Sequence, residues 1–331
     1  MILSSLADKS AATAAARLEL ARTYYLLGAR VAANPGARPP GPEGRRPPRE
    51  PGQAPPGAGE PVGPPRPGPE PGRPDPDRRK HLDQAVALLN GLLQDQPASP
   101  ACRHLLALCY REMPPGSNGY DKAVELLTGL AGEFPGAVDY QFDLCQTYAA
   151  EVRPPAAQGP EPPGAQERLS KALEISRELL RRQPKVPEYL ASQSHIYHKL
   201  GAIARRMRRP DEAEQYDRKA VEVQAGLARE FPDVAAYQVW LAAFRTSLAD
   251  TLIEKGKPDE AREVLETSIA QTQRLLQGHP AMWYLHALLM DSNRSLAAAW
   301  RRVGRTDQAD QADAQAQVHR SHLGTPGTPE R

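Results

Sequence analysis

The sequence repeats itself at intervals that are marked by proline. Successive prolines of the series are separated by 38, 49, 48 and 48 residues: Pro97, Pro135, Pro184, Pro232 and Pro280. A tyrosine follows five residues after three of them and four residues after the last, giving Tyr140, Tyr189, Tyr237 and Tyr284. A repeat of this length predicts stacked copies of one small structural unit, because a single copy cannot bury its apolar face alone.

A second motif precedes each proline and predicts the start of a helix. An Asp or Ser stands two residues before an Ala, where its side chain can bond free N–H groups or face the positive end of the helix dipole. The proline then stops that helix. Apolar residues between the two signals have helical spacing, as in Ala261, Val264 and Leu265. The chain is therefore expected to be all-α. The copies are Asp83 with Ala85, Asp121 with Ala123, Ser170 with Ala172, Asp211 with Ala213, Asp259 with Ala261, and Asp307 with Ala309, which begins a final unit.

The repeat resembles the tetratricopeptide repeat (TPR). Leu20, Ala21, Tyr24 and Gly28 match the pattern of its first helix, helix A. Three Ala-to-Pro pairs have the twelve-residue spacing of its second helix, helix B: Ala85/Pro97, Ala123/Pro135 and Ala172/Pro184. The spacing is nineteen in the two units that follow, Ala213/Pro232 and Ala261/Pro280, which resembles a long-helix variant. The resemblance covers about residues 14–33 and 79–320. It implies a right-handed superhelical solenoid of about six helix-turn-helix units.

The repeat divides the chain into expected segments. Units one and two occupy residues 8–33 and 79–135, and a Pro/Gly-rich insertion at 34–78 separates the helices of unit one. Unit three occupies 136–184 with a smaller insertion at 153–164. The long-helix units four to six are expected to occupy 185–320, and 321–331 are expected to form a disordered tail. The insertion at 34–78 holds 17 of the 35 prolines and is expected to be disordered. Its PxxP spacings suit a ligand of an SH3-like domain, and low-complexity drift is the alternative.

Composition excludes several classes of partner. The net charge of +2 provides no field that would favour nucleic acid or a membrane surface. No apolar run is long enough to span a bilayer, and residues 1–33 lack the pattern of a signal peptide. We therefore expect a cytoplasmic protein. Cys102, Cys109 and Cys145 are expected to be buried thiols in helices A.

The sequence contains no motif of an enzyme. It has no phosphate-binding loop, no dinucleotide fingerprint, no kinase motif and no nucleophile elbow, so we expect a non-enzymatic protein without a cofactor. His195 and His198 could approach one metal ion, but no further ligand has a telling spacing, so groove or surface positions are expected. Trp240, Trp283 and Trp300, like the tyrosines after the prolines, are expected to pack in the core. The clusters Arg205–Arg209 and Arg301–Arg305 suit an acidic ligand or the ends of helices.

A function is expected in the concave groove that helices A line in this family. The resemblance places nine residues there: His104, Phe142, Gln146, His195, Lys199, Thr246, His286, Met290 and Asn293. Their mixed character argues against the two-carboxylate clamp of chaperone-binding repeats. The first hypothesis is a scaffold that binds a protein or peptide partner. The second is a regulatory module that works with a Ser/Thr kinase or transcription regulator, since similar arrays occur C-terminal to bacterial Ser/Thr kinases and regulators.

Overall fold

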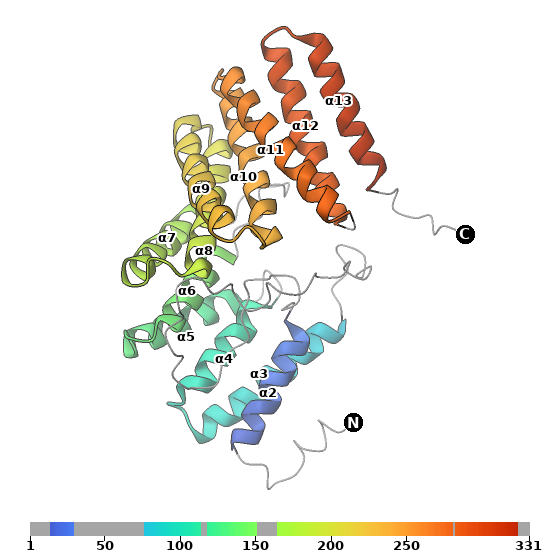
Figure 1. The fold of residues 1–331 in the computed structure, drawn as a ribbon. Coiled ribbons are helices and arrows are strands. Elements are labelled where there is room, and N and C mark those ends of the chain that lie inside the picture. Colours follow the sequence, from blue (N-terminus) through green and yellow to red (C-terminus); the bar gives the residue numbers. More distant parts are fainter. Residues whose placement is uncertain (1–13, 30–75, 114–117, 151–163, 281, 324–331) are drawn as a thin grey trace, which may run out of the picture. The chain divides into compact units, whose positions relative to one another are not determined.

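The computed structural model describes residues 14–29, 76–113, 118–150, 164–280 and 282–323, and these residues form helices and no strand (Figure 1). Contacts divide the chain into two compact units. The described helices of unit 1 pair in chain order as α2 with α3, α4 with α5 and α6 with α7. Their bounds are α2 Ala14–Gly28, α3 Pro76–Asp95, α4 Pro100–Arg111, α5 Gly119–Glu133, α6 Val138–Ala150 and α7 Ala165–Arg182.

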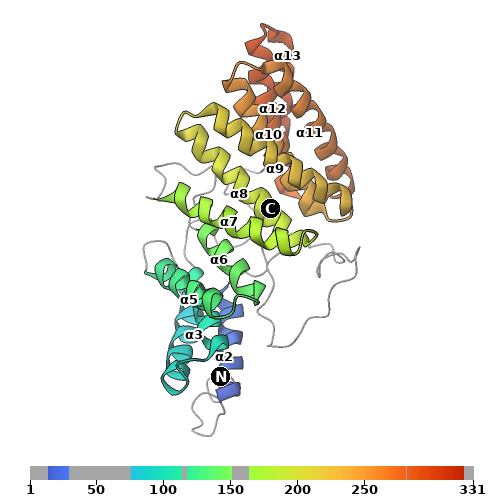
Figure 2. The ribbon, with the colours of Figure 1, turned by 90° about the vertical axis from the view of Figure 1, so that its left-hand side faces the viewer.

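Unit 2 consists of three longer hairpins, and its helices follow one another side by side in both views (Figures 1 and 2). Its A helices begin at equal intervals of 48 residues, and so do its B helices. The consistent difference from unit 1 lies in the A helices, which have 20 residues each in unit 2 and 12 to 15 in unit 1. The B helices do not show the uniform gain of two turns that the nineteen-residue spacing predicts, because α3 has 20 residues and α9 and α11 have 21. The bounds are α8 Pro187–Arg206, α9 Pro210–Glu230, α10 Ala235–Glu254, α11 Pro258–Gly278, α12 Trp283–Arg302 and α13 Thr306–Ser321.

The prolines of the repeat stop the B helices, as the sequence predicts. Each of α3, α5, α7, α9 and α11 ends two residues before its proline. The residue between helix end and proline leaves the helical region; Phe134 and Phe231, for example, have φ −126° and ψ 65° or 68°. The following proline ring disfavours the helical conformation for this residue, which explains why each helix ends here.

The expected helix starts are correct in four of the six copies. Asp121, Asp211, Asp259 and Asp307 lie in the first turns of α5, α9, α11 and α13, where they face the positive end of the dipole, and none of them is the N-cap residue. The prediction is wrong for Asp83 and Ser170. Helices α3 and α7 already begin at Pro76 and Ala165, so these two residues lie inside their helices.

The alanine of the same motif is buried in every copy. Ala309, the alanine of the last copy, lies on α13 and packs in a cluster with Ala297 of α12 and Ala312. Because protein interiors are closely packed, a larger side chain at this position would have to displace its neighbours. The six alanines are fully buried: Ala85, Ala123, Ala172, Ala213, Ala261 and Ala309. Of the tyrosines after the prolines, Tyr189 is buried, and Tyr140, Tyr237 and Tyr284 are half-buried.

The turns inside the hairpins of unit 2 share one backbone geometry. Arg208, Gly256 and Gly304 follow α8, α10 and α12 with φ of 58°, 72° and 73°, in the left-handed region. The next amide donates back to the helix, from Arg209 N to Ala204 O at 2.9 Å in the first hairpin. This is the Schellman motif, whose left-handed position favours glycine.

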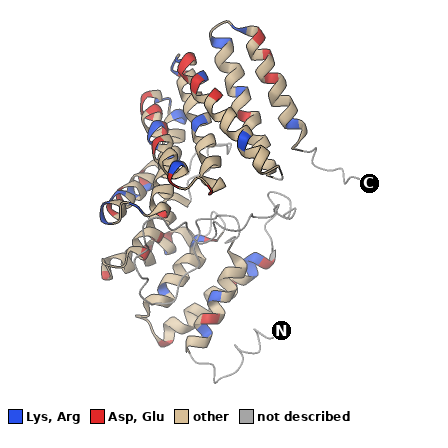
Figure 3. Cartoon of the chain, viewed as in Figure 1, with Lys and Arg blue, Asp and Glu red and all other residues tan. Residues whose placement is uncertain are grey.

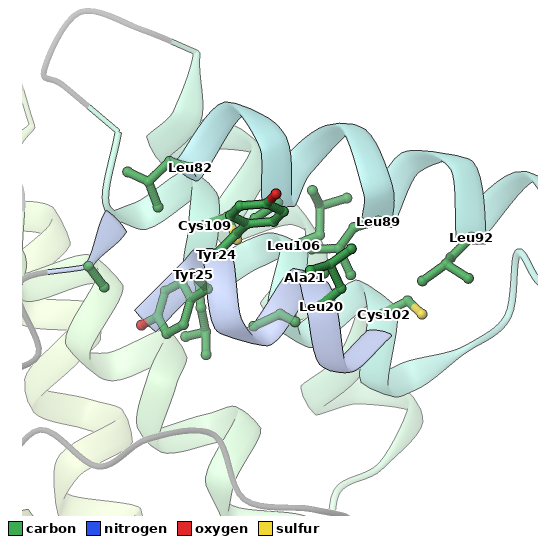
Figure 4. Close-up of a cluster of buried hydrophobic side chains, with 14 residues drawn as sticks. Leu20, Ala21, Tyr24, Tyr25, Leu82, Leu89, Leu92, Cys102, Leu106 and Cys109 are labelled. Carbon is green, nitrogen blue, oxygen red and sulfur yellow. The ribbon is translucent and has the colours of Figure 1, made fainter. Parts of the chain in front are cut away.

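The core of unit 1 includes a cluster contributed by α2, α3 and α4 (Figure 4). Helix α2 provides Leu20 and Tyr24, and α3 provides Leu89, which is fully buried. Arg78 of α3 donates from Nε to the carbonyl oxygen of Gly28 at 2.6 Å. The two helices of the first hairpin therefore pack directly, although residues 30–75 separate them in sequence. Most of the expected insertions and tail lie outside the described residues.

The interior of unit 2 contains buried polar groups. Asp217 on α9 is 1% exposed and accepts hydrogen bonds from Arg205 on α8 and from Thr251 Oγ1 on α10, the latter at 2.7 Å. Burial raises the pKa of Asp217. Gly201 on α8 makes room for this carboxylate, because a Cβ atom there would overlap Asp217 Oδ1. The charged residue thus ties three successive helices together.

Ion pairs also join the hairpins of unit 2 around the buried carboxylate of Glu214. Glu214 on α9 accepts from Lys255 at 2.5 Å, from Lys257 at 2.8 Å and from Arg218 at 2.8 Å. Arg218 also pairs with Glu260 on α11. Figure 3 shows basic and acidic residues interspersed along the helices, in agreement with the small net charge.

Candidate functional site

The candidate site of unit 2 lies where α10 packs against α8 and carries an exposed tryptophan. Trp240 is 41% exposed and Trp283, at the start of α12, is 54% exposed. The expectation that these two side chains pack in the core is therefore wrong. Trp300 is half-buried, and the Arg262 guanidinium lies 4.6 Å from its ring centre.

Trp240 rests on a platform of aromatic rings. The ring of His195 on α8 lies 4.4 Å from that of Trp240, edge to face, and 5.3 Å from the buried ring of Phe244. His198 also stacks on Phe244, with its ring 4.7 Å from the phenyl ring. Such contacts contribute roughly 0.5–1.5 kcal/mol each beyond the area they bury. The exposed indole is therefore held in place by its neighbours.

Burial controls the ionisation of the groups around the platform. It lowers the pKa of His195, and it lowers the pKa of His198 to about 3, so both rings are neutral at pH 7. His195 also makes a 2.8 Å hydrogen bond between Nδ1 and the carbonyl oxygen of Ala191. Burial lowers the pKa of Lys199 to about 8. We call His195, Lys199 and Trp240 the Trp240 surface.

Two of the other groove residues expected in unit 2 are buried. Thr246 is buried and shares a 2.8 Å hydrogen bond with Ser292 of α12, and Asn293 is buried and donates to the carbonyl oxygen of Leu289. Neither is accessible to a partner, so these two assignments are wrong; α10 and α12 pack closely enough to enclose them. Met290 is half-buried.

His286 faces α13, where its Nδ1 lies 3.1 Å from Nδ1 of His319 and its ring stacks on that of His322 at 4.3 Å. Burial lowers the pKa of His286 and of His319. The described residues contain no group of three or more His, Cys, Asp or Glu side chains that could hold a metal ion.

In unit 1 the expected residue His104 belongs to a polar contact between α4 and α6. Its Nε2 lies 2.7 Å from Asp143 Oδ2, and Arg111 donates to the other oxygen of the same carboxylate at 3.2 Å. Burial would raise the pKa of Asp143, but the hydrogen bond from His104 and the charge of Arg111 outweigh it and lower the pKa. Phe142 and Gln146 lie on α6 and are half-buried.

Residues 194–233 match the sequence model of the tetratricopeptide repeat, and this segment covers most of α8 and all of α9. The same helical hairpin recurs before and after it in the described residues. The hairpin formed by residues 194–233 is therefore a tetratricopeptide repeat. No curated protein matches the chain significantly.

Several solved structures with a similar arrangement of helices are distant from this chain in sequence. BtubC (BKLC) from P. vanneervenii is 16% identical over 76% of this chain and 94% of its own, with a TM-score of 0.48. The crystal structure of MamA is 16% identical over 63% and 96%, with a TM-score of 0.39. TTC0263, a thermophilic TPR protein of Thermus thermophilus, is 19% identical over 66% and 91%, with a TM-score of 0.35.

The exposure of Trp240 cannot be predicted from the sequence, because the sequence of α10 has little amphipathic contrast. Its first ten residues, Ala235–Phe244, include one polar side chain, Gln238, so apolar periodicity cannot say which face is outside. One signal of the exposed position is the spacing of three residues between Tyr237 and Trp240. This spacing places the two side chains next to each other on the helix surface. To use that signal, one must already know whether Tyr237 or Trp240 is directed toward the preceding helices.

Proposed function

We propose that the chain is a non-enzymatic scaffold that binds a protein or peptide partner, and that Trp240 anchors one binding surface. The observation that carries the proposal is the exposed indole, held on His195 and Phe244 in a fold that buries most of its large apolar side chains. Tryptophan is enriched among the residues that dominate binding energy at interfaces. The repeat itself is generally a scaffold fold without catalytic activity, which supports the same proposal.

The chemistry of the Trp240 surface defines its partner. The indole offers a flat apolar face, His195 is neutral at pH 7, and Lys199 one helical turn further along α8 supplies a positive charge at that pH. A segment with an apolar side chain followed by a carboxylate fits these groups best. The narrower hypothesis, a module that acts with a Ser/Thr kinase or transcription regulator, uses the same surface and predicts that such a protein copurifies with the chain.

The test is selection of displayed random peptides on the full chain, followed by affinity measurements with purified variants. Trp240→Ala is expected to weaken the selected peptides at least about tenfold, as removal of an interface tryptophan does. Val318→Ala is the matched control, because Val318 on α13 is 50% exposed and apolar but lies outside the surface. Unchanged affinity of every selected peptide for Trp240→Ala would contradict the proposal.

The proposal includes a reducing compartment such as the cytoplasm. All three cysteines, Cys102, Cys109 and Cys145, are buried in helices A and form no disulfide with one another, in agreement with a protein that does not use disulfides. No helix in the described part of the chain is long and apolar enough to cross a membrane. Cell fractionation of the tagged full chain tests the location.

A further inference from the structure

A pocket lies between α8 and α9, away from the Trp240 surface. It has a volume of about 420 Å³, within the range of roughly 300–1,000 Å³ typical of ligand pockets. The spacing of its α8 residues places them on the face opposite Ala191, His195 and Lys199. It is lined by Leu190, Gln193 and Tyr197 of α8 and by Lys219, Glu222, Val223, Gly226, Leu227 and Glu230 of α9.

Gln193 is the unusual residue of this pocket. It is 9% exposed, yet its side chain makes no hydrogen bond with any described residue. A carboxamide carries two N–H donors and a carbonyl acceptor. Neither polar atom of Gln193 is among the fully buried side-chain atoms without a partner, so both are open to the space of the pocket. An unpaired amide at the wall of a pocket suits a ligand that supplies one donor and one acceptor together. A peptide group of an extended chain supplies both.

The rest of the wall suits a peptide main chain with an apolar side chain. Leu190, Val223 and Leu227 form an aliphatic surface, and the Tyr197 ring is fixed between the ring of Tyr216, at 6.4 Å, and the ammonium group of Lys219, at 5.6 Å. Gly226 leaves a gap in this wall, because a Cβ atom there would meet nothing within 4 Å. A partner backbone can therefore approach α9 closely at this position.

The charges of the rim select the flanking residue. Glu222 and Glu230 provide two negative charges, while the one positive charge of the lining, on Lys219, already lies against the Tyr197 ring. Glu230 is also the last residue of α9, where the helix dipole is negative. A cationic side chain complements this rim, and a carboxylate is repelled.

We propose that the α8–α9 pocket binds an extended, basic segment of a partner protein. An aliphatic side chain of the segment packs on Leu190, Val223 and Leu227, its backbone pairs with the Gln193 amide, and a Lys or Arg faces Glu222 and Glu230. The site is separate from the Trp240 surface, whose cation favours acidic segments, so one chain holds two segments of opposite charge.

The probe is a positional-scanning library of short peptides blocked at both ends, measured by fluorescence polarisation with the full chain. Peptides with an aliphatic residue next to Lys or Arg are expected to bind. Gln193→Leu and Gly226→Leu each weaken them about tenfold, the first by removing the hydrogen bonds and the second by filling the gap. Trp240→Ala leaves these basic peptides unchanged. Failure of the basic peptides to bind the wild-type chain would overturn the proposal.

Folding and charge controls make the test specific. Gly226→Leu improves helix propensity and is expected to fold, and Gly129→Leu on the exposed face of α5 is its matched control. The double variant Glu222→Lys, Glu230→Lys should reverse the preference toward acidic peptides. If basic peptides bind Gly226→Leu as tightly as they bind the wild type, the pocket is not their binding site. The same conclusion follows if Trp240→Ala abolishes the binding of basic peptides. The second result would leave the Trp240 surface as a binding site with a different charge preference.

Discussion

Three equivalent turn residues in unit 2 illustrate how single positions are constrained. Gly256 and Gly304 occupy a left-handed conformation that glycine adopts without steric cost, whereas Arg208 adopts it with φ 58°. For residues other than glycine, this conformation costs roughly 1–2 kcal/mol, because Cβ approaches a carbonyl oxygen. The hairpin of α8 and α9 thus contains a strained residue that the other two hairpins avoid.

Replacement of Arg208 by glycine is expected to stabilise the protein by about 1 kcal/mol. The replacement removes the steric strain, and the larger loss of backbone entropy when glycine folds offsets part of this stabilisation. Urea denaturation followed by circular dichroism measures the change. Gly256→Ala is the reciprocal variant and is expected to lose about the same amount. Equal stability of both variants and the wild type would show that the turns relax without cost.

Individual helices in unit 2 are coupled by charge as well as by packing. Burial alone would raise the pKa of Glu214, but hydrogen bonds from Lys255, Lys257 and Arg218 outweigh it and lower the pKa to about 2. A carboxylate whose pKa is lower in the folded state stabilises that state above its unfolded pKa. Because Lys255 directly follows α10 and Lys257 precedes α11, Glu214 links three helices.

The stabilisation by Glu214 is expected to disappear as the pH falls from about 4.5, the ordinary pKa of a glutamate, to about 2. Melting temperatures of the wild type and Glu214→Gln should therefore differ at pH 6 and converge across this window. The exposed Glu263 on α11 provides the control, and Glu263→Gln should follow the wild-type curve throughout. A constant difference between wild type and Glu214→Gln would exclude ionisation as the cause.

The helices were predictable from the sequence because their signals are local. Proline restricts the residue before it, so Pro135 and Pro232 mark helix ends without knowledge of the fold. The exposed face of α10 was not predictable in this way, since neighbouring helices decide which side of an apolar helix is covered. The pocket was not predictable either, because Gln193 and Gly226 come together only through the register in which α8 packs against α9.

Within each of the two units, the described helices contact their neighbours in the chain. In unit 2 each helix contacts the next, and the A helices also contact the A helices of adjacent hairpins. Stability of such arrays approximates a sum of terms for each repeat and each interface. The Asp217 contacts that join α8, α9 and α10 are one set of interface interactions that lies entirely within unit 2.

A fragment of residues 185–331 is expected to fold alone, with a helical circular dichroism spectrum and a cooperative thermal transition. A shorter fragment of residues 209–331 lacks α8 and so loses the partners of Asp217 and Phe244 on that helix; its transition should occur at lower temperature. A disordered spectrum for the longer fragment would show that unit 2 depends on the rest of the chain.

The equal spacing of the helices in unit 2 has a consequence for how such a chain evolves. Since both helices of a hairpin recur at intervals of 48 residues, duplication or loss of one block of that length leaves every remaining helix in phase with its neighbours. One recombination event can therefore lengthen or shorten the array without disturbing its packing. A binding surface that is copied in this way can then diverge from the original and acquire a new specificity.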